Sequence, residues 1–281
     1  MKKFNDLVVR PLGTVSTYCC GDLCCPGYLI KYGSNNILLD CGNGITRHLN
    51  IPDDLKNLTV IISHLHSDHY GDLLSLAQTS LVLHRLGYLS ERINVYIPNS
   101  DKIKASESYI DSDGWGSSRI VEKNLPDYDY LLCLEQESFL RFIPYQQNNI
   151  LEFDDLITSF VKNPHPITTY STKLETDGLK VVYSSDTGYN GNKLEKFAED
   201  ANLLICESTF LRGQTRMTDH HLFAHEAGKI AASANVKQLM LTHFWPSIDK
   251  SEYVKEAMEE FNNVVAAEEG KQLVLRRNNN G

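Results

Sequence analysis

The sequence of 281 residues contains no apolar run that approaches the about 20 residues needed by a membrane-spanning helix. Residues 1–6 carry two lysines, but no apolar stretch long enough for a signal peptide follows them. An excess of positive charge is also missing, because 36 acidic residues outnumber 27 lysines and arginines and the formal net charge is −9. These absences argue against a membrane protein and predict a cytoplasmic one. The negative charge also disfavours strong non-specific binding to polyanions.

The sequence also lacks internal repeats and long linkers, so we expect a single domain over residues 1–281. Its seven cysteines fit reduced thiols better than a disulfide framework. Four of them form a cluster at Cys19, Cys20, Cys24 and Cys25. Because their spacing matches no standard zinc pattern, a structural or substrate-loop role is favoured over a metal site.

Short apolar and β-branched runs alternate with segments of helical period along most of the chain. They predict strands at residues 7–12, 27–32, 37–40, 56–63, 93–98, 139–144, 155–161, 180–184, 203–206 and 238–242, and helices at residues 73–86, 193–199, 222–234 and 250–262. This order favours two sheets packed face to face with helices outside over a doubly wound parallel sheet. Residues 101–137 show no clear period and form a candidate lid or substrate-selecting insertion, with a partly ordered connection or a dimer contact as the alternative.

The most informative stretch follows the β-branched apolar run at residues 60–62 and contains His64, His66, Asp68 and His69. In a strand, residues two apart face the same side, so His64 and His66 point at one spot, and a turn can aim the next two side chains into the same cavity. Imidazole nitrogen and carboxylate oxygen suit Zn²⁺, and also Mn²⁺ or Fe²⁺. Four such residues within six outweigh the alternative of a surface turn or core histidines.

Three further ligand-type residues follow predicted strands or sit in a turn-rich loop: His165, Asp186 and His243. Loops at strand ends commonly carry functional side chains on a rigid scaffold. We therefore predict that all seven residues meet at one metal site.

The His-x-His-x-Asp-His box at residues 64–69, with the later histidine and aspartate motifs in order, resembles the metallo-β-lactamase-fold hydrolases. The resemblance covers nearly the whole chain and implies a four-layer αββα sandwich, an α/β (α+β) fold of two mixed sheets. It implies two divalent metal ions, most simply Zn²⁺. By this resemblance His64, His66 and His165 hold one metal, Asp68, His69 and His243 hold the other, and Asp186 bridges them. Asp40 would support the histidines from behind.

The same resemblance implies hydrolysis by a hydroxide shared between the two metals, with Asp68 part of the catalytic centre. A bridging aspartate at position 186, where β-lactamases tend to have cysteine, argues against lactam hydrolysis. The segment Cys206-Glu207-Ser208-Thr209-Phe210 and the histidine at His221 are similar to motifs of the ribonuclease Z branch. By this resemblance His221 lies near the scissile phosphate and Glu207 orients it. His220 is the alternative to His221, and His225 is expected to be structural.

Two departures from that branch bear on the substrate. Phe223 replaces a threonine that the histidine motif usually carries, and only 21 positions separate His165 from Asp186 (186 − 165). Residues 168–183 predict a compact hairpin there, so the basic arm that tRNA-processing relatives carry at this place is missing. Together with the net charge of −9, this argues against tRNA as the main substrate.

The sequence therefore predicts a dinuclear metal-dependent hydrolase, with a phosphodiesterase acting on a small or short phosphodiester as the first hypothesis. Carbon-ester or lactone hydrolysis at the same site is the second hypothesis. A metal-bound sensor module with little turnover is the third, disfavoured by the complete set of ligands. A homodimer is expected from the family.

Overall fold

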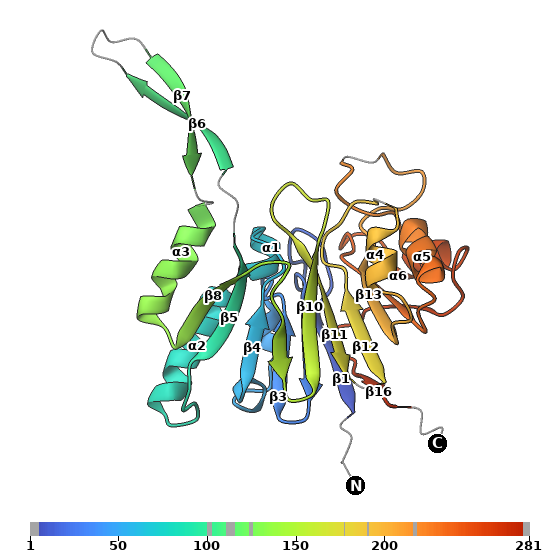
Figure 1. The fold of residues 1–281 in the computed structure, drawn as a ribbon, viewed down its shortest axis with the longest axis horizontal. Coiled ribbons are helices and arrows are strands. Elements are labelled where there is room, and N and C mark those ends of the chain that lie inside the picture. The colour runs from blue at the N-terminus through green and yellow to red at the C-terminus, as the bar shows by residue number, and fades with distance from the viewer. Residues whose placement is uncertain are drawn as a thin grey trace.

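The computed structural model describes residues 6–99, 103–110, 116–123, 126–176, 178–189, 191–215 and 218–277. Two seven-stranded sheets lie face to face at the centre of the molecule, and helices cover the outer face of each sheet (Figure 1). This arrangement confirms the predicted αββα sandwich. None of the helices in these ranges combines the length and the apolar character needed to cross a membrane.

The first sheet mixes antiparallel pairs at one side with parallel pairs at the other. Its strands, in spatial order, are β16 (Leu273–Leu275), β1 (Leu7–Gly13), β2 (Gly27–Tyr32), β3 (Asn35–Leu39), β4 (Leu58–Ile61), β5 (Ile93–Pro98) and β8 (Leu140–Tyr145). The edge strand β16, near the C-terminus, pairs antiparallel with β1, near the N-terminus.

The second sheet is antiparallel from β9 to β12 and parallel from β12 to β15. Its strands, in spatial order, are β15 (Val264–Ala266), β14 (Leu239–Thr242), β13 (Leu203–Glu207), β12 (Leu179–Tyr183), β11 (Tyr170–Thr176), β10 (Leu156–Lys162) and β9 (Leu151–Phe153). Strands β11 and β12 form the compact hairpin predicted between His165 and Asp186.

The α-helices are α1 (Ser67–Tyr70), α2 (Leu73–Arg85), α3 (Pro126–Leu134), α4 (Lys193–Phe197), α5 (Ala224–Ser233) and α6 (Lys250–Ala257), and the short 3₁₀ helices are η1 (Ile45–His48), η2 (Asp53–Leu55) and η3 (Glu135–Glu137). The longer helices α2 and α5 form where buried residues recur at three- and four-residue spacing. The last predicted helix is too long, because α6 ends at Ala257 and not near residue 262.

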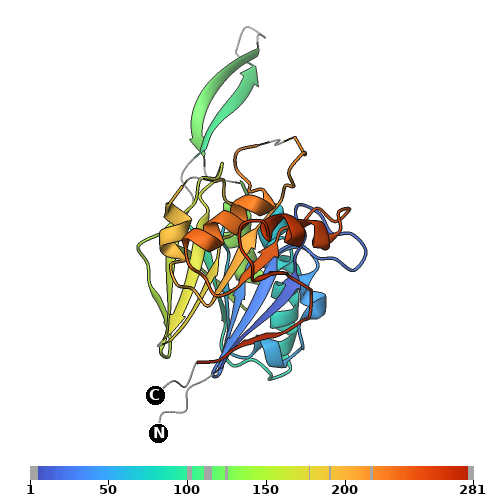
Figure 2. The ribbon, with the colours of Figure 1, turned by 90° about the vertical axis from the view of Figure 1, so that its right-hand side faces the viewer.

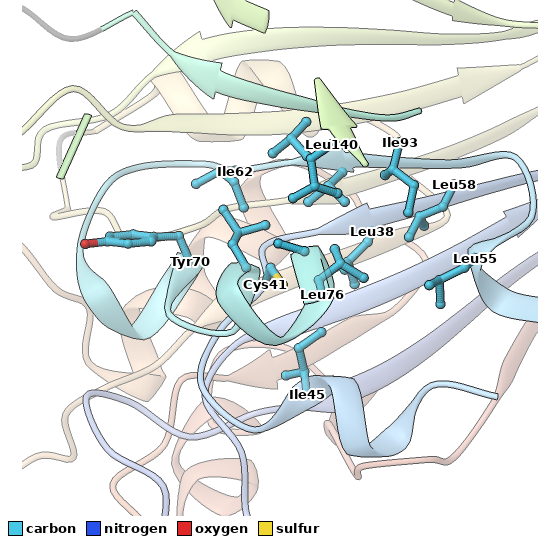
Figure 3. Close-up of a cluster of buried hydrophobic side chains, with 14 of the residues drawn as sticks. Leu38, Cys41, Ile45, Leu55, Leu58, Ile62, Tyr70, Leu76, Ile93 and Leu140 are labelled. Atoms are coloured by element: carbon cyan, nitrogen blue, oxygen red, sulfur yellow. The ribbon is translucent and has the colours of Figure 1, made fainter. Parts of the chain in front are cut away.

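Three layers of buried apolar side chains hold the sandwich together. One layer lies between the first sheet and α2, and Figure 3 shows Leu38, Leu58, Leu76 and Ile93 meeting there. A second fills the space between the sheets, and a third packs the second sheet against α4, α5 and α6. Burial of this apolar surface is the main favourable term in folding, at about 25 cal/mol per Å².

The region at residues 101–137 folds as a two-stranded hairpin, β6 (Ile103–Ile110) and β7 (Gly116–Lys123), followed by α3. Figures 1 and 2 both show this hairpin extending away from the sandwich. Residues 101–102, 111–115 and 124–125 lie outside the described ranges. The role of this segment as a lid or substrate-selecting insertion stays a prediction.

Candidate metal centre

Parallel strands bring the predicted site residues to one edge of the sandwich. The carboxyl ends of β3 and β4 in one sheet, and of β12, β13 and β14 in the other, open onto the same edge, where α1 lies (Figure 1). Asp40 follows β3, Asp186 lies beyond β12, Glu207 ends β13, and His243 follows β14. Residues distant in sequence therefore meet because of the strand order.

The strand that precedes the motif at residues 64–69 ends earlier than predicted. Strand β4 ends at Ile61. The Ile62 amide still donates to the Tyr96 carbonyl of β5 (2.8 Å), but the Ser63 amide donates to the carboxylate of Asp40 (2.6 Å) and not to a neighbouring strand. His64 and His66 lie in the extended segment beyond it, and His66 has φ −88° and ψ 141° at the start of α1. The two imidazoles still converge as predicted, with His64 Nε2 3.0 Å from His66 Nδ1.

The first set of donor atoms consists of His64 Nε2, His66 Nδ1, His165 Nε2 and Asp186 Oδ2. His165 Nε2 lies 3.1 Å from His66 Nδ1. Asp186 Oδ2 lies 3.6 Å from His64 Nε2 and 4.0 Å from His165 Nε2. The loop of His165 is tied to Asp186 by the Asn163 amide, which donates to the Asp186 carbonyl (2.9 Å).

The second set consists of Asp68, His69 and His243, and the other oxygen of Asp186 faces it. Asp68 Oδ2 lies 3.7 Å from His69 Nε2 and 3.6 Å from His243 Nε2. Asp186 Oδ1 lies 3.2 Å from His69 Nε2 and 3.3 Å from His243 Nε2. Asp186 therefore presents one oxygen to each set, and all seven predicted ligands lie at one site.

Both sets fit a divalent metal ion. Donors about 2.1 Å from a tetrahedral ion lie about 3.4 Å apart, and the separations above scatter around that value. Three buried atoms have no hydrogen-bond partner among the described residues although they lie close together: His69 Nε2, Asp186 Oδ1 and His243 Nε2. Buried polar atoms are rarely left unpaired, so an ion at this position would supply the missing interaction.

The protonation of the first set also suits a metal. Burial lowers the pKa of His64 and His66, and it lowers the pKa of His165 to about 4. Removal of a charged imidazolium from water is costly, so these rings stay neutral. The neutral imidazole is the form that offers a lone pair to a cation.

Asp40 lies behind the site, as predicted, and is fully buried. Its carboxylate accepts hydrogen bonds from His69 Nδ1 (2.7 Å), from the Ser63 hydroxyl (2.8 Å) and from the Tyr183 hydroxyl (2.7 Å). The bond to Nδ1 leaves His69 Nε2 as the atom that faces the second set. Asp40 thereby fixes both the orientation and the tautomer of one predicted ligand.

Glu207 and His221 form the predicted pair beside both sets. His221 Nδ1 donates to Glu207 Oε1 (2.9 Å), lies 4.0 Å from Asp186 Oδ2, and its ring stacks on His243 with centroids 5.3 Å apart. Burial by itself would lower the pKa of His221, but the Glu207 carboxylate more than offsets this and raises it to about 9. The contact with Glu207 therefore favours the imidazolium form of His221.

The remaining sequence candidates lie outside the two sets. His225 Nδ1 pairs with Glu256 (2.9 Å), in agreement with the predicted structural role. His220 is exposed, and its ring centroid lies 6.1 Å from that of His165. Cys19 Sγ lies 3.8 Å from Cys25 Sγ, but the described cysteines form no group of three ligand-type side chains.

Gly42 has a tightly packed position under the metal motif. A Cβ there would lie 2.2 Å from the Asp68 carbonyl oxygen and 2.7 Å from the Cys25 carbonyl carbon, and backbone atoms cannot yield as a flexible side chain can. We expect Gly42→Ala to lower the free energy of unfolding by about 1–3 kcal/mol and to weaken metal binding by displacing Asp68. Thermal unfolding and a zinc titration measure both effects. Gly27→Ala is the control, because its nearest neighbour would be a side-chain methyl of Ile45 at 3.0 Å; equal losses in the two variants would contradict the expectation.

The αββα fold and the seven converging donors define the class of protein: a metal-dependent hydrolase. The model of the beta-lactamase superfamily domain matches residues 35–244, and the chain belongs to this superfamily. The matched residues include every predicted metal ligand.

Individual relatives show which members of the superfamily the chain is similar to. YhfI of Bacillus subtilis, named a probable metallo-hydrolase, is 27% identical over 219 residues, which cover 77% of this chain and 78% of the relative. The crystal structure of YhfI matches with a TM-score of 0.80 and 25% identity, over 96% of this chain and 99% of that one. Ribonuclease Z of Chlamydia trachomatis serovar L2 is 28% identical over 278 residues, which cover 86% of this chain and 88% of the relative.

The short form of human tRNase Z shares the fold, with a TM-score of 0.69 at 19% identity over 96% of this chain and 99% of that one. The sequence similarity to ribonuclease Z confirms the predicted resemblance to the ribonuclease Z-like branch.

Proposed function

We propose that the chain is a dinuclear metal-dependent phosphodiesterase of the ribonuclease Z-like type. His64, His66 and His165 would hold one ion, Asp68, His69 and His243 the other, and Asp186 would contribute one oxygen to each. The proposal is supported mainly by Asp186, because its Oδ2 faces the first donor set and its Oδ1 faces the second. Nitrogen and carboxylate donors at these separations suit Zn²⁺ best, with Mn²⁺ and Fe²⁺ as alternatives.

When bound, such a pair of ions acidifies water to a pKa of about 7 and stabilises negative charge on the attacked ester. The protein groups prepare the centre for this chemistry. Burial keeps His64, His66 and His165 neutral, and Asp40 holds His69 by its Nδ1 hydrogen. Because these groups are fixed before substrate binds, little reorganisation accompanies the reaction.

The His221 imidazolium supports a phosphodiester over an uncharged ester. It is a positive hydrogen-bond donor, 18% exposed in its side chain, and Glu207 holds it beside Asp186. A cation in this place attracts a phosphate oxygen and can donate a proton to a leaving alkoxide. The similarity to proteins named ribonuclease Z points in the same direction.

A small or short phosphodiester is the substrate that we propose. The β11–β12 hairpin leaves no room in the chain for a long arm between His165 and Asp186, and the net charge of −9 weakens attraction to a large polyanion. The experiment should therefore compare short RNAs and cyclic nucleotides with tRNA precursors at a fixed salt concentration.

The test combines metal content by mass spectrometry with turnover of bis(p-nitrophenyl) phosphate and of a p-nitrophenyl carboxylate ester. We expect about two metal ions per chain and phosphodiester turnover that a chelator removes and Zn²⁺ or Mn²⁺ restores. Two ions with turnover of the carboxylate ester alone would move the assignment to a carbon-ester or lactone hydrolase. Two ions without either activity would favour a sensor, and failure to bind any ion after repletion would overturn the proposal.

A further inference from the structure

Thr209 connects the two parts of the site that the sequence motifs describe separately. This residue follows β13, is 2% exposed, and carries a hydroxyl that lies 2.8 Å from Glu207 Oε2 and 2.8 Å from His243 Nδ1. The same hydroxyl lies 3.4 Å from His221 Nδ1. One buried oxygen thus stands between a carboxylate, a predicted metal ligand and the predicted proton donor.

The direction of these hydrogen bonds follows from the chemistry of Glu207. Its carboxylate receives hydrogen bonds from the Thr187 amide (2.9 Å), the Leu222 amide (3.2 Å) and His221 Nδ1 (2.9 Å), so it acts as an acceptor on all sides. The Thr209 hydroxyl has one hydrogen, which it must donate to this acceptor. Only its lone pairs then remain for the histidine.

It follows that His243 Nδ1 carries the hydrogen and donates it to Thr209. In a neutral imidazole the other nitrogen is then free of hydrogen. That nitrogen, His243 Nε2, lies 3.3 Å from Asp186 Oδ1 and 3.6 Å from Asp68 Oδ2, where the second ion would be held. The hydroxyl therefore turns the lone pair of His243 toward the metal position.

We propose that Thr209 is a positioning residue that sets the tautomer of His243 and links it to Glu207. Glu207 would then serve two histidines, His221 by direct contact and His243 through the Thr209 hydroxyl. The inference deepens the proposed function and rests on it in one respect, because it takes His243 to be a metal ligand.

A second buried carboxylate, Asp40 beside the first sheet, makes the same kinds of contact. Asp40 accepts a hydrogen bond from His69 directly (2.7 Å) and another from the Ser63 hydroxyl (2.8 Å), and that hydroxyl lies 3.0 Å from His64 Nδ1. A buried carboxylate again orients one histidine by contact and a second through a hydroxyl. This repetition on two different sheets indicates that the hydroxyl contacts belong to the metal centre and not to local packing.

The substitution Thr209→Val keeps the shape of the side chain and removes the hydroxyl. His243 Nδ1 then loses its acceptor, and the tautomer with a hydrogen on Nε2 becomes accessible. We expect the affinity for the second metal equivalent, measured by competition with a chelator, to fall about 10- to 100-fold, while Thr209→Ser retains it.

Thr158→Val is the matched control. Thr158 is fully buried in β10, and its hydroxyl has no hydrogen-bond partner among the described residues. The same chemical change there should leave metal affinity as in the wild type. An equal loss of metal affinity in Thr158→Val and Thr209→Val would mean that the loss comes from changing any buried threonine. That result would overturn the inference.

A second readout uses metal-free protein labelled with ¹⁵N in its histidines, in which NMR reports the tautomer of each ring. We expect a hydrogen-bonded hydrogen on His243 Nδ1 in the wild type and in Thr209→Ser, and loss of that hydrogen or its rapid exchange with solvent in Thr209→Val, where Nδ1 has lost its acceptor. An unchanged Nδ1 hydrogen together with unchanged metal affinity in Thr209→Val overturns the inference even where the wild type binds two ions. A wild type that binds fewer than two ions overturns the proposed function instead, and the NMR result then judges the Thr209–His243 contact by itself.

Discussion

Asp186→Asn is expected to lower phosphodiester turnover by at least about 10³-fold and to weaken the binding of both metal equivalents. Asp186 faces both donor sets, with Oδ2 toward the first and Oδ1 toward the second. A neutral amide removes one charge from both and offers a poorer donor. Metal ions contribute several kcal/mol to transition-state stabilisation, and about 1.4 kcal/mol corresponds to a factor of ten in rate.

The measurement pairs kcat/KM on bis(p-nitrophenyl) phosphate with metal content after dialysis against a weak chelator. Asp219→Asn serves as the control, because Asp219 is an exposed carboxylate in the neighbouring loop. Circular dichroism of both variants separates loss of metal from loss of fold. Retention of both metal equivalents in Asp186→Asn, with turnover near that of the wild type, would show that Asp186 does not bridge two ions.

The sequence predicts strands β13 and β14 to within one residue at one end. Both are buried along their whole length, so their apolar runs are continuous and easy to recognise. Strand β5 has the predicted bounds although its burial alternates, whereas β4 is two residues shorter at each end than predicted. The helix α2, which carries a single apolar face, is predicted to within one residue for the related reason that its period is regular.

The outer strands β9, β15 and β16 were not predicted, because three residues are too few to show alternation. Strand β16 forms only by pairing with β1, from which it is separated by most of the chain. The hairpin of β6 and β7 was also missed, since it does not pair with either main sheet and its sequence shows no regular alternation. These elements depend on contacts that a local pattern does not contain.

The functional site likewise contains residues that the sequence predicts and residues that it does not. The seven ligand-type residues could be predicted because histidine and aspartate at strand ends are chemically distinctive and the family motif fixes their order. Thr209 and Ser63 could not, because threonine and serine are common and their roles depend on which histidine the folded chain places beside them. The sequence indicates what can bind a metal, whereas the hydroxyls that orient the ligands emerge only from tertiary contacts.

Glu207 holds His221 beside the two donor sets, where its imidazolium could supply a proton to the leaving group. His221→Ala is expected to lower phosphodiester turnover by about 10²- to 10⁴-fold while metal content stays at the wild-type level. The reason is that His221 contacts Glu207 and, although its ring also lies within ligand distance of Asp186 and His243, the seven predicted ligands form two donor sets without it. Metal content and kcat are measured on the same preparation.

The leaving group distinguishes the two roles open to His221. A p-nitrophenolate departs without a proton, whereas an alkoxide requires one. If His221 donates a proton, the loss in His221→Ala should be much larger for an alkyl phosphodiester than for bis(p-nitrophenyl) phosphate. If it only stabilises negative charge on the phosphate, both substrates should lose turnover equally. The same assays on His220→Ala decide between the two adjacent histidines, and normal turnover of both substrates by His221→Ala would mean that the Glu207–His221 pair has no part in the reaction.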